Sequence, residues 1–150
     1  QLKEKSFFEK PFNPAHILSN KKHYIRFHNT KAKRLLRAKE IWDQIEQVIL
    51  ANESVYSKRE QLVRLVDGFG FKEASHFLRN IGYSGIAILD RHILRNLSNY
   101  GVIDSEYKIS TPKKYLAVES KFLEFSKTIG ITLEELDLLF WAKETRFVLK

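Results

Sequence analysis

The sequence contains no cysteine and no methionine. Without cysteine the chain can form no disulfide, no thiolate zinc site and no thiol nucleophile. It also lacks any run of about 18 apolar residues that would span a bilayer, so we expect a soluble intracellular protein. Because the first residue is Gln1 rather than methionine, we expect the natural beginning of the protein to be missing from this chain.

What the chain does have is enough apolar material for one domain. Its 150 residues are 43% hydrophobic, which excludes a disordered tail. A net charge of +8 favours an anionic partner, either nucleic acid or an acidic membrane surface. The membrane is disfavoured because no lysine-rich amphipathic helix presents an apolar face to it.

Positive charge is concentrated between Lys21 and Lys39, a stretch without an acidic residue. These side chains either contact phosphates or form a solvated helix face. Tyr24 and Phe27 lie among them and are expected to pack inward, with stacking on bases as the alternative. The basic residues of the stretch are Lys21, Lys22, Arg26, Lys31, Lys33, Arg34, Arg37 and Lys39.

Apolar residues recur at three-to-four spacing from residue 30 onward, which predicts helices. The first is expected over residues 30–49, with Asn29 or Thr30 as its N-cap. A shorter helix follows and stops at Asp67, and another is expected over residues 72–81. Gly82 is well placed to end it.

The second half of the chain carries clear helix boundaries. Residues 86–89 are all apolar and predict a buried crossing segment that leads into a helix over residues 91–100. Later helices are expected to start at Thr111-Pro112 and at the capping box of Thr132 with Glu135. With no alternating strand pattern and no repeats, the sequence predicts an all-α fold, a single unit over residues 1–150.

The turn between the two short helices contains the spacing Gly68-Phe69-Gly70. Residues 62–74, LVRLVDGFGFKEA, place apolar side chains around this turn in a pattern that resembles the helix-hairpin-helix motif of DNA-binding and DNA-repair proteins. Glycines allow backbone N–H groups to approach a phosphate closely, and the following helix points its positive end at the same anion. Most isolated Gly-x-Gly turns merely join two helices.

A longer stretch resembles one particular family. Residues 70–80, GFKEASHFLRN, and 87–95, AILDRHILR, are similar to the archaeal and bacterial 8-oxoguanine DNA glycosylase/lyases of the Ogg2 family. Residues 135–141, ELDLLFW, and 148–150, VLK, resemble the carboxyl end of that family, and residues 26–32, RFHNTKA, its basic helix start. The carboxyl end is therefore expected to be native. The family's longer N-terminal part is not recognisable in residues 1–17, so the unit is expected to be incomplete there.

The resemblance implies the helix-hairpin-helix glycosylase fold, with two small helical subdomains flanking a DNA-binding cleft. It places Lys72 in the position of the nucleophile and Asp90 in that of the catalytic acid. A carboxylate stabilises the positive charge that develops on the sugar as the base leaves. An uncharged lysine amine can attack the same carbon to form a Schiff base, which requires Lys72 to be poorly solvated. Without the resemblance, Lys72 is interpreted as a surface lysine and Asp90 as the N-cap of the next helix.

The resemblance also implies residues that recognise the damaged base. Trp141 is the candidate for stacking on a flipped base, although core packing explains it equally well. The terminal carboxylate of Lys150 is implied to accept the N7–H that 8-oxoguanine has and guanine lacks. His76 and His92 either line the cleft or are ordinary solvated or core histidines. No histidine spacing suits a metal site, and the resemblance permits a monovalent cation at Gly68 and Gly70.

The leading hypothesis is a bifunctional enzyme that excises 8-oxoguanine from double-stranded DNA and cleaves the abasic site, without a metal or redox cofactor. The alternative is a non-catalytic helix-hairpin-helix DNA-binding module, which needs the glycines and the basic stretch but neither Lys72 nor Asp90. We expect a monomer, located in the prokaryotic cytoplasm with the nucleoid.

Overall fold

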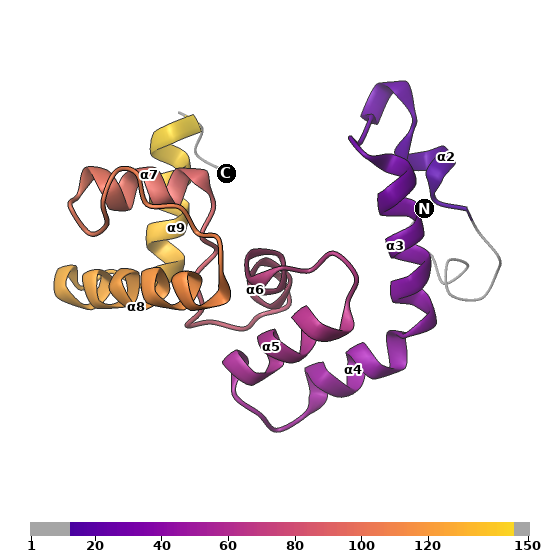
Figure 1. Ribbon diagram of the computed structural model, residues 1–150, viewed down its shortest axis with the longest axis horizontal. Helices are drawn as coiled ribbons and strands as arrows, with labels where there is room; N and C mark the ends of the chain where they lie inside the picture. The colour runs from indigo at the N-terminus through magenta and orange to yellow at the C-terminus, as the bar shows by residue number, and fades with distance from the viewer. Residues whose placement is uncertain (1–12, 146–150) are drawn as a thin grey trace. The chain divides into compact units, whose positions relative to one another are not determined.

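The computed structural model describes residues 13–145, which contain helices, turns and loops and no strand (Figure 1). The prediction of an all-α chain is confirmed. No helix in this range is long and apolar enough to cross a membrane. The elements are α2 (Ala15–Leu18), the short 3-10 helix η1 (Lys21–His23), α3 (His28–Glu40), α4 (Trp42–Leu50), α5 (Val55–Leu65), α6 (Phe71–Asn80), α7 (Arg91–Asn99), α8 (Pro112–Ile129) and α9 (Leu133–Thr145).

The chain divides into two compact units. The first comprises Gln1–Asn52 with Arg64–Gly68, and the second comprises Glu53–Val63 with Phe69–Lys150. The boundary passes through the end of α5 and through the hairpin, so Gly68 belongs to the first unit and Gly70 to the second.

In the first unit, the single helix expected over residues 30–49 is two helices. The chain leaves the helical region at Ile41, with φ −103° and ψ 16°, so that α3 ends and α4 begins there. Ile41 is 6% exposed and Ile45 is 3% exposed, which indicates that packing of these side chains decides the break. The predicted cap is also wrong, because α3 begins at His28 with Phe27 in the N-cap position and in the left-handed conformation.

The second unit holds the larger apolar core. Helix α9 packs against both α7 and α8 (Figure 1). The core side chains are buried almost completely, which explains the three-to-four apolar spacing of these helices. They come from the crossing segment, the three helices and, for Ile103, the loop between α7 and α8: Ala87, Leu89, Ile93, Leu97, Ile103, Tyr115, Val118, Phe122, Leu133, Leu136 and Phe140.

The helix boundaries of this unit follow their local signals. Thr111 caps α8 by accepting a hydrogen bond from the Lys114 amide, and Pro112 occupies the first turn. Thr132 and Glu135 exchange the hydrogen bonds of a capping box at the start of α9. Both predicted starts are confirmed.

The crossing segment before α7 is buried, as its composition predicts. Ile86 and Ala87 are 0% exposed and Leu89 is 4% exposed. The segment is neither helix nor strand, so its backbone N–H and C=O groups need partners outside regular structure. Side chains of α6 and α8 supply several of those partners, and the segment leads directly into Asp90.

Candidate active site

One pocket in the second unit brings together three residues that the sequence marks as functional. Lys72 on α6, Asp90 at the start of α7 and Trp141 on α9 all line it. Its volume is about 510 Å³, which is large enough to admit a nucleobase-sized group. These residues lie up to 69 positions apart in the chain, so only folding brings them together.

Asp90 has a rigid carboxylate. Its Oδ1 accepts hydrogen bonds from the amides of His92 at 2.8 Å and Ile93 at 2.9 Å, and its own amide donates to the Ile88 carbonyl at 2.8 Å. The capping role expected for Asp90 is therefore confirmed. Because the same side chain lines the pocket, capping also fixes the orientation of this carboxylate at the pocket wall.

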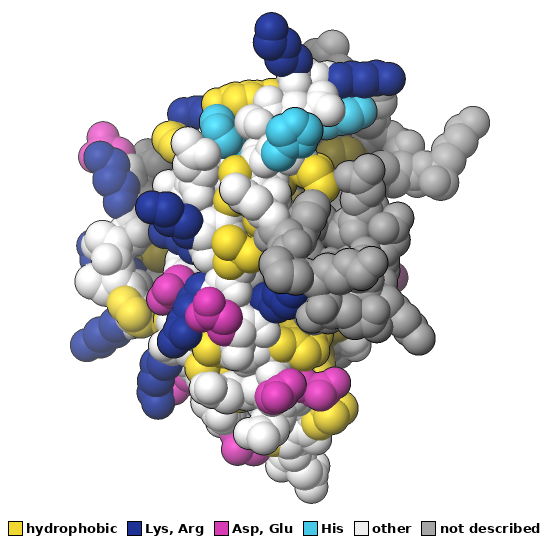
Figure 2. Space-filling model, turned by 90° about the vertical axis from the view of Figure 1, so that its right-hand side faces the viewer, with side chains coloured by type: hydrophobic (Ala, Val, Ile, Leu, Met, Phe, Trp, Pro, Cys, Tyr) yellow, Lys and Arg dark blue, Asp and Glu magenta, His cyan; other side chains and the backbone are white. Residues whose placement is uncertain are grey.

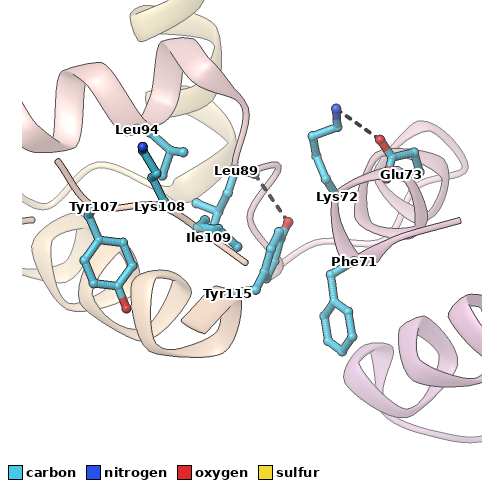
Figure 3. A pocket seen from close by; sticks show the side chains of 9 residues that line it. All are labelled: Phe71, Lys72, Glu73, Leu89, Leu94, Tyr107, Lys108, Ile109 and Tyr115. Atoms are coloured by element: carbon cyan, nitrogen blue, oxygen red, sulfur yellow. Dashed lines mark hydrogen bonds and ion pairs between the residues drawn. The ribbon is translucent and has the colours of Figure 1, made fainter. Parts of the chain in front are cut away.

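Lys72 is less buried than the chemistry requires. Its side chain is 47% exposed, and its Nζ lies 3.0 Å from Glu73 Oε1. Figure 3 shows the side chain extending away from Phe71 and toward Glu73. The expectation of a poorly solvated lysine is wrong for the protein without DNA, because its position in the first turn of α6 leaves the amine open to solvent.

Glu73 also caps the helix that carries Lys72. Its Oε2 accepts a hydrogen bond from the Gly70 amide at 3.2 Å. Partial burial raises the pKa of Glu73, but hydrogen bonds from Lys72 and from backbone amides lower it further, so the pKa lies below its ordinary value. The carboxylate therefore occupies a hairpin amide that the sequence assigns to a DNA phosphate.

Gly68, in the first unit, needs its glycine for two reasons. Its φ of +84° is a conformation that other residues rarely adopt. A Cβ added there would also lie 2.4 Å from the guanidinium carbon of Arg34, a residue of α3. The basic stretch and the hairpin glycine are thus in direct contact.

We expect Gly68→Ala to destabilise the protein by more than Gly101→Ala. Both glycines have positive φ, and the strain of placing alanine there costs about 1 kcal/mol. A Cβ at Gly101 meets nothing within 4 Å, whereas at Gly68 it displaces Arg34. Urea unfolding of both variants measures the difference, and equal losses would show that the Arg34 contact does not contribute.

The sequence analysis missed two charged residues in the pocket. Asp137 on α9 and Arg79 on α6 line it, and Arg79 Nη1 donates to Asp137 Oδ2 at 2.6 Å. Asp137 Oδ1 is buried and has no hydrogen-bond partner among the described residues. The available signal was the spacing of four between Asp137 and Trp141, which places both on one face of a helix.

Burial raises the pKa of Asp137 to about 6; the ion pair with Arg79 lowers it in part, and the negative charges of Glu134 and Asp90 raise it. A carboxyl that binds its proton more tightly when folded makes the protein more stable as the pH falls through its folded pKa.

We therefore expect wild type to gain about 1 kcal/mol of stability relative to Asp137→Asn between pH 7 and pH 5. Urea unfolding at both pH values measures this gain. If the two proteins change in parallel, Asp137 does not titrate in this range.

The other predicted site residues have different outcomes. His76 and His92 both line the pocket; His76 is exposed, and His92 Nδ1 lies 3.7 Å from Glu144 Oε2. Lys150 lies outside the described residues. Within residues 13–145, no three His, Asp or Glu side chains converge in a way that would hold a metal ion.

The basic stretch lies on the surface of the first unit. All of its lysines and arginines are exposed except Lys39, which is partly buried. In the face drawn in Figure 2, Lys, Arg and His side chains gather at the upper end. Tyr24 and Phe27 are 57% and 68% exposed, so the expectation that they pack inward is wrong. The exposed face suits either phosphate contact or simple solvation.

Comparison with known proteins identifies the family. The family model described as 8-oxoguanine DNA glycosylase matches residues 1–131. The chain belongs to this family. The match includes residues 1–17, where we expected no recognisable family pattern. The predicted family is therefore confirmed; the match contains residues 26–32, 70–80 and 87–95, whereas residues 135–141 and 148–150 lie outside it.

Members of the 8-oxoguanine DNA glycosylase family from distant organisms are similar to this chain. An 8-oxoguanine DNA glycosylase/AP lyase of Fusobacterium nucleatum is 42% identical over 132 residues, which cover 84% of this chain and 61% of the relative. One from Methanocaldococcus jannaschii is 40% identical over 125 residues, covering 83% of this chain and 60% of the relative. The chain thus spans about three fifths of the length of these relatives.

Solved structures of the family show the same fold. The crystal structure of the Methanocaldococcus jannaschii 8-oxoguanine DNA glycosylase matches with a TM-score of 0.82 at 36% identity, over 97% of this chain and 68% of that one. The same enzyme in complex with a 15mer DNA containing 8-oxoguanine matches with a TM-score of 0.79 at 36% identity, over 97% and 70%. The predicted glycosylase fold class is confirmed.

Proposed function

We propose that this protein excises 8-oxoguanine from double-stranded DNA and cleaves the resulting abasic site. The observation that carries the proposal is the pocket in which Lys72, Asp90 and Trp141 meet, in a chain of the 8-oxoguanine DNA glycosylase family. A lysine and a carboxylate facing one pocket are the groups that base excision through a Schiff base needs. A Methanocaldococcus relative that binds DNA containing 8-oxoguanine supports the choice of substrate.

Asp90 acts first in this mechanism. As the bond between C1′ and the base breaks, the electron pair of that bond leaves with the base, and positive charge develops on the sugar. The carboxylate of Asp90, held by two amides of α7, stabilises that charge without having to reorient. Trp141 offers a flat surface on which the flipped base stacks.

Lys72 acts second. After the Lys72 ammonium has lost a proton, its amine forms a bond with C1′; the bond between C1′ and the ring oxygen then breaks, that oxygen takes up a proton and a Schiff base results. Loss of a proton from C2′ then breaks the bond between C3′ and its oxygen, and the 3′ phosphate leaves. Because Lys72 pairs with Glu73 in the protein without DNA, this pair must separate before the amine attacks. A phosphate on the Gly70 amide would displace Glu73 from its capping position.

The partner of the site is duplex DNA, with the exposed basic stretch of the first unit as a phosphate-binding surface. A base-reading role for Lys150, a monovalent cation at the hairpin, a monomeric state and a location in the cytoplasm stay predictions. None of them is needed for the chemistry of Lys72 and Asp90.

The test is a labelled duplex that contains one 8-oxoguanine, with the undamaged duplex as the control. We expect release of the oxidised base, followed by strand cleavage without added alkali, and neither product from the control duplex. If the chain binds the damaged duplex but releases no base, the alternative of a non-catalytic DNA-binding module replaces the proposal.

A further inference from the structure

A buried ion pair joins α5 to α8 within the second unit. The Arg59 side chain is 1% exposed and the Glu119 side chain 6%. Arg59 Nη1 donates to Glu119 Oε1 at 2.5 Å, and Nη2 donates to Oε2 at 2.7 Å. The rings of Tyr56, Phe71 and Tyr115 have their centroids within 5.5, 5.0 and 5.6 Å of the guanidinium carbon. The pair is thus bidentate and enclosed by aromatic rings.

Stability alone does not explain such a pair. Removing two charges from water costs about as much as their mutual attraction returns, so apolar residues of the same volume would serve stability as well. The remaining hydrogen bonds of the cluster indicate another role. They end on the crossing segment that leads to Asp90 and on the helix that carries Lys72.

The first connection reaches the crossing segment. Glu119 Oε1 accepts a hydrogen bond from the Ala87 amide at 2.8 Å. The Tyr115 hydroxyl donates to the Ala87 carbonyl at 2.8 Å and accepts from the Leu89 amide at 3.3 Å, the bond drawn in Figure 3. Burial raises the pKa of Tyr115, so this hydroxyl keeps the proton that it donates. Leu89 directly precedes Asp90, and these bonds satisfy a backbone that has no helix or sheet partners.

The second connection reaches α6. Arg59 Nη1 also donates to the Ser75 hydroxyl at 3.1 Å, and Ser75 is 0% exposed. Ser75 lies one helical turn after Lys72. At the start of the same helix, Phe71 lies against the guanidinium, immediately before Lys72.

We propose that the Arg59–Glu119 pair is a positioning device that holds Asp90 and Lys72 in one arrangement, by tying the crossing segment and α6 to the same buried group. The inference rests on the proposed function. These residues do not touch substrate, and they act through the backbone that carries the two catalytic groups. Misplacing a catalytic group by about 1 Å can slow a reaction about 100-fold, so loosening either connection lowers a rate constant and leaves DNA affinity unchanged.

Two substitutions each remove one hydroxyl and so weaken one connection, either the one to the crossing segment or the one to α6. Tyr115→Phe keeps the ring against Arg59 but frees the Ala87 carbonyl and the Leu89 amide, while the Ala87 amide stays bonded to Glu119. We expect it to slow release of 8-oxoguanine about tenfold in single-turnover reactions, with a smaller effect on cleavage of a duplex that already contains an abasic site. Ser75→Ala releases α6 instead, and we expect it to slow abasic-site cleavage more than base release.

The ratio of the two rates on one preparation is the deciding measurement, because the folded fraction cancels from it. Tyr100→Phe is the matched control, since Tyr100 is 52% exposed and does not line the pocket that holds Lys72 and Asp90. Unchanged ratios in both variants of an active protein, or a loss of DNA affinity that accounts for the slower rates, would overturn the inference. A wild-type chain without base release or cleavage would instead overturn the proposed function.

Discussion

Replacing Lys72 by glutamine is expected to abolish the covalent adduct that borohydride traps between the protein and a duplex containing 8-oxoguanine. Borohydride reduces a Schiff base to a stable amine, so an adduct forms only where a lysine amine has attacked the sugar. Glutamine has no such amine. Strand cleavage at the abasic site should therefore fall to the background rate, while duplex affinity changes by less than about threefold, as one lost surface charge implies.

Stability should not change with Lys72→Gln. The variant loses the ion pair with Glu73, in which the Lys72 side chain is 47% exposed and the Glu73 side chain 45%. Exposed pairs of this kind contribute between about 0 and 1 kcal/mol to the free energy of unfolding. Lys121→Gln removes the same charge from an exposed position on α8 outside the pocket that holds Lys72, and serves as the matched control. An adduct that persists in Lys72→Gln would assign the nucleophile to a different residue.

Asp90→Asn is expected to lower the rate of base release by at least about 100-fold, because a neutral amide does not stabilise the positive charge on the sugar. Its thermal stability should remain near that of wild type. The asparagine oxygen can accept the same amides of His92 and Ile93, and asparagine is as good an N-cap as aspartate.

Asp90→Ala separates the two roles of this residue. It should lose the same activity and, in addition, about 1 kcal/mol of stability through the lost cap. Single-turnover base release and urea unfolding of both variants give the comparison. Full activity in Asp90→Asn would show that Asp90 is only a cap and would remove it from the mechanism.

Residues close together in the sequence determined most of the helix boundaries in advance. Thr111 with Pro112, and Thr132 with Glu135, act on amides no more than three positions away, so each pair carries its own structural signal. The hairpin glycines are also local signals, because they lie in the turn that they form. The family resemblance around Lys72 and Asp90 was also readable, since it depends on contiguous residues.

Burial, by contrast, was decided by partners far along the chain. Arg59 and Glu119 are 60 positions apart, and Arg79 and Asp137 are 58 apart. A charged residue is expected to be exposed when its partner is unknown, because charged side chains are rarely buried without one. Neither pair was therefore predicted. The break at Ile41 is similar, because apolar periodicity continues through it and only the packing of the first unit ends α3 there.

The site combines both kinds of information. Local patterns in the sequence suffice to place a lysine at the start of one helix and an aspartate at the start of another in an all-α chain, because helix caps and motifs depend on neighbouring residues. Folding brings the two into one pocket with Trp141 and Asp137, and leaves Lys72 half exposed and paired with Glu73. The physical reason is that solvation and charge pairing depend on neighbours in space, which the order of residues alone does not specify.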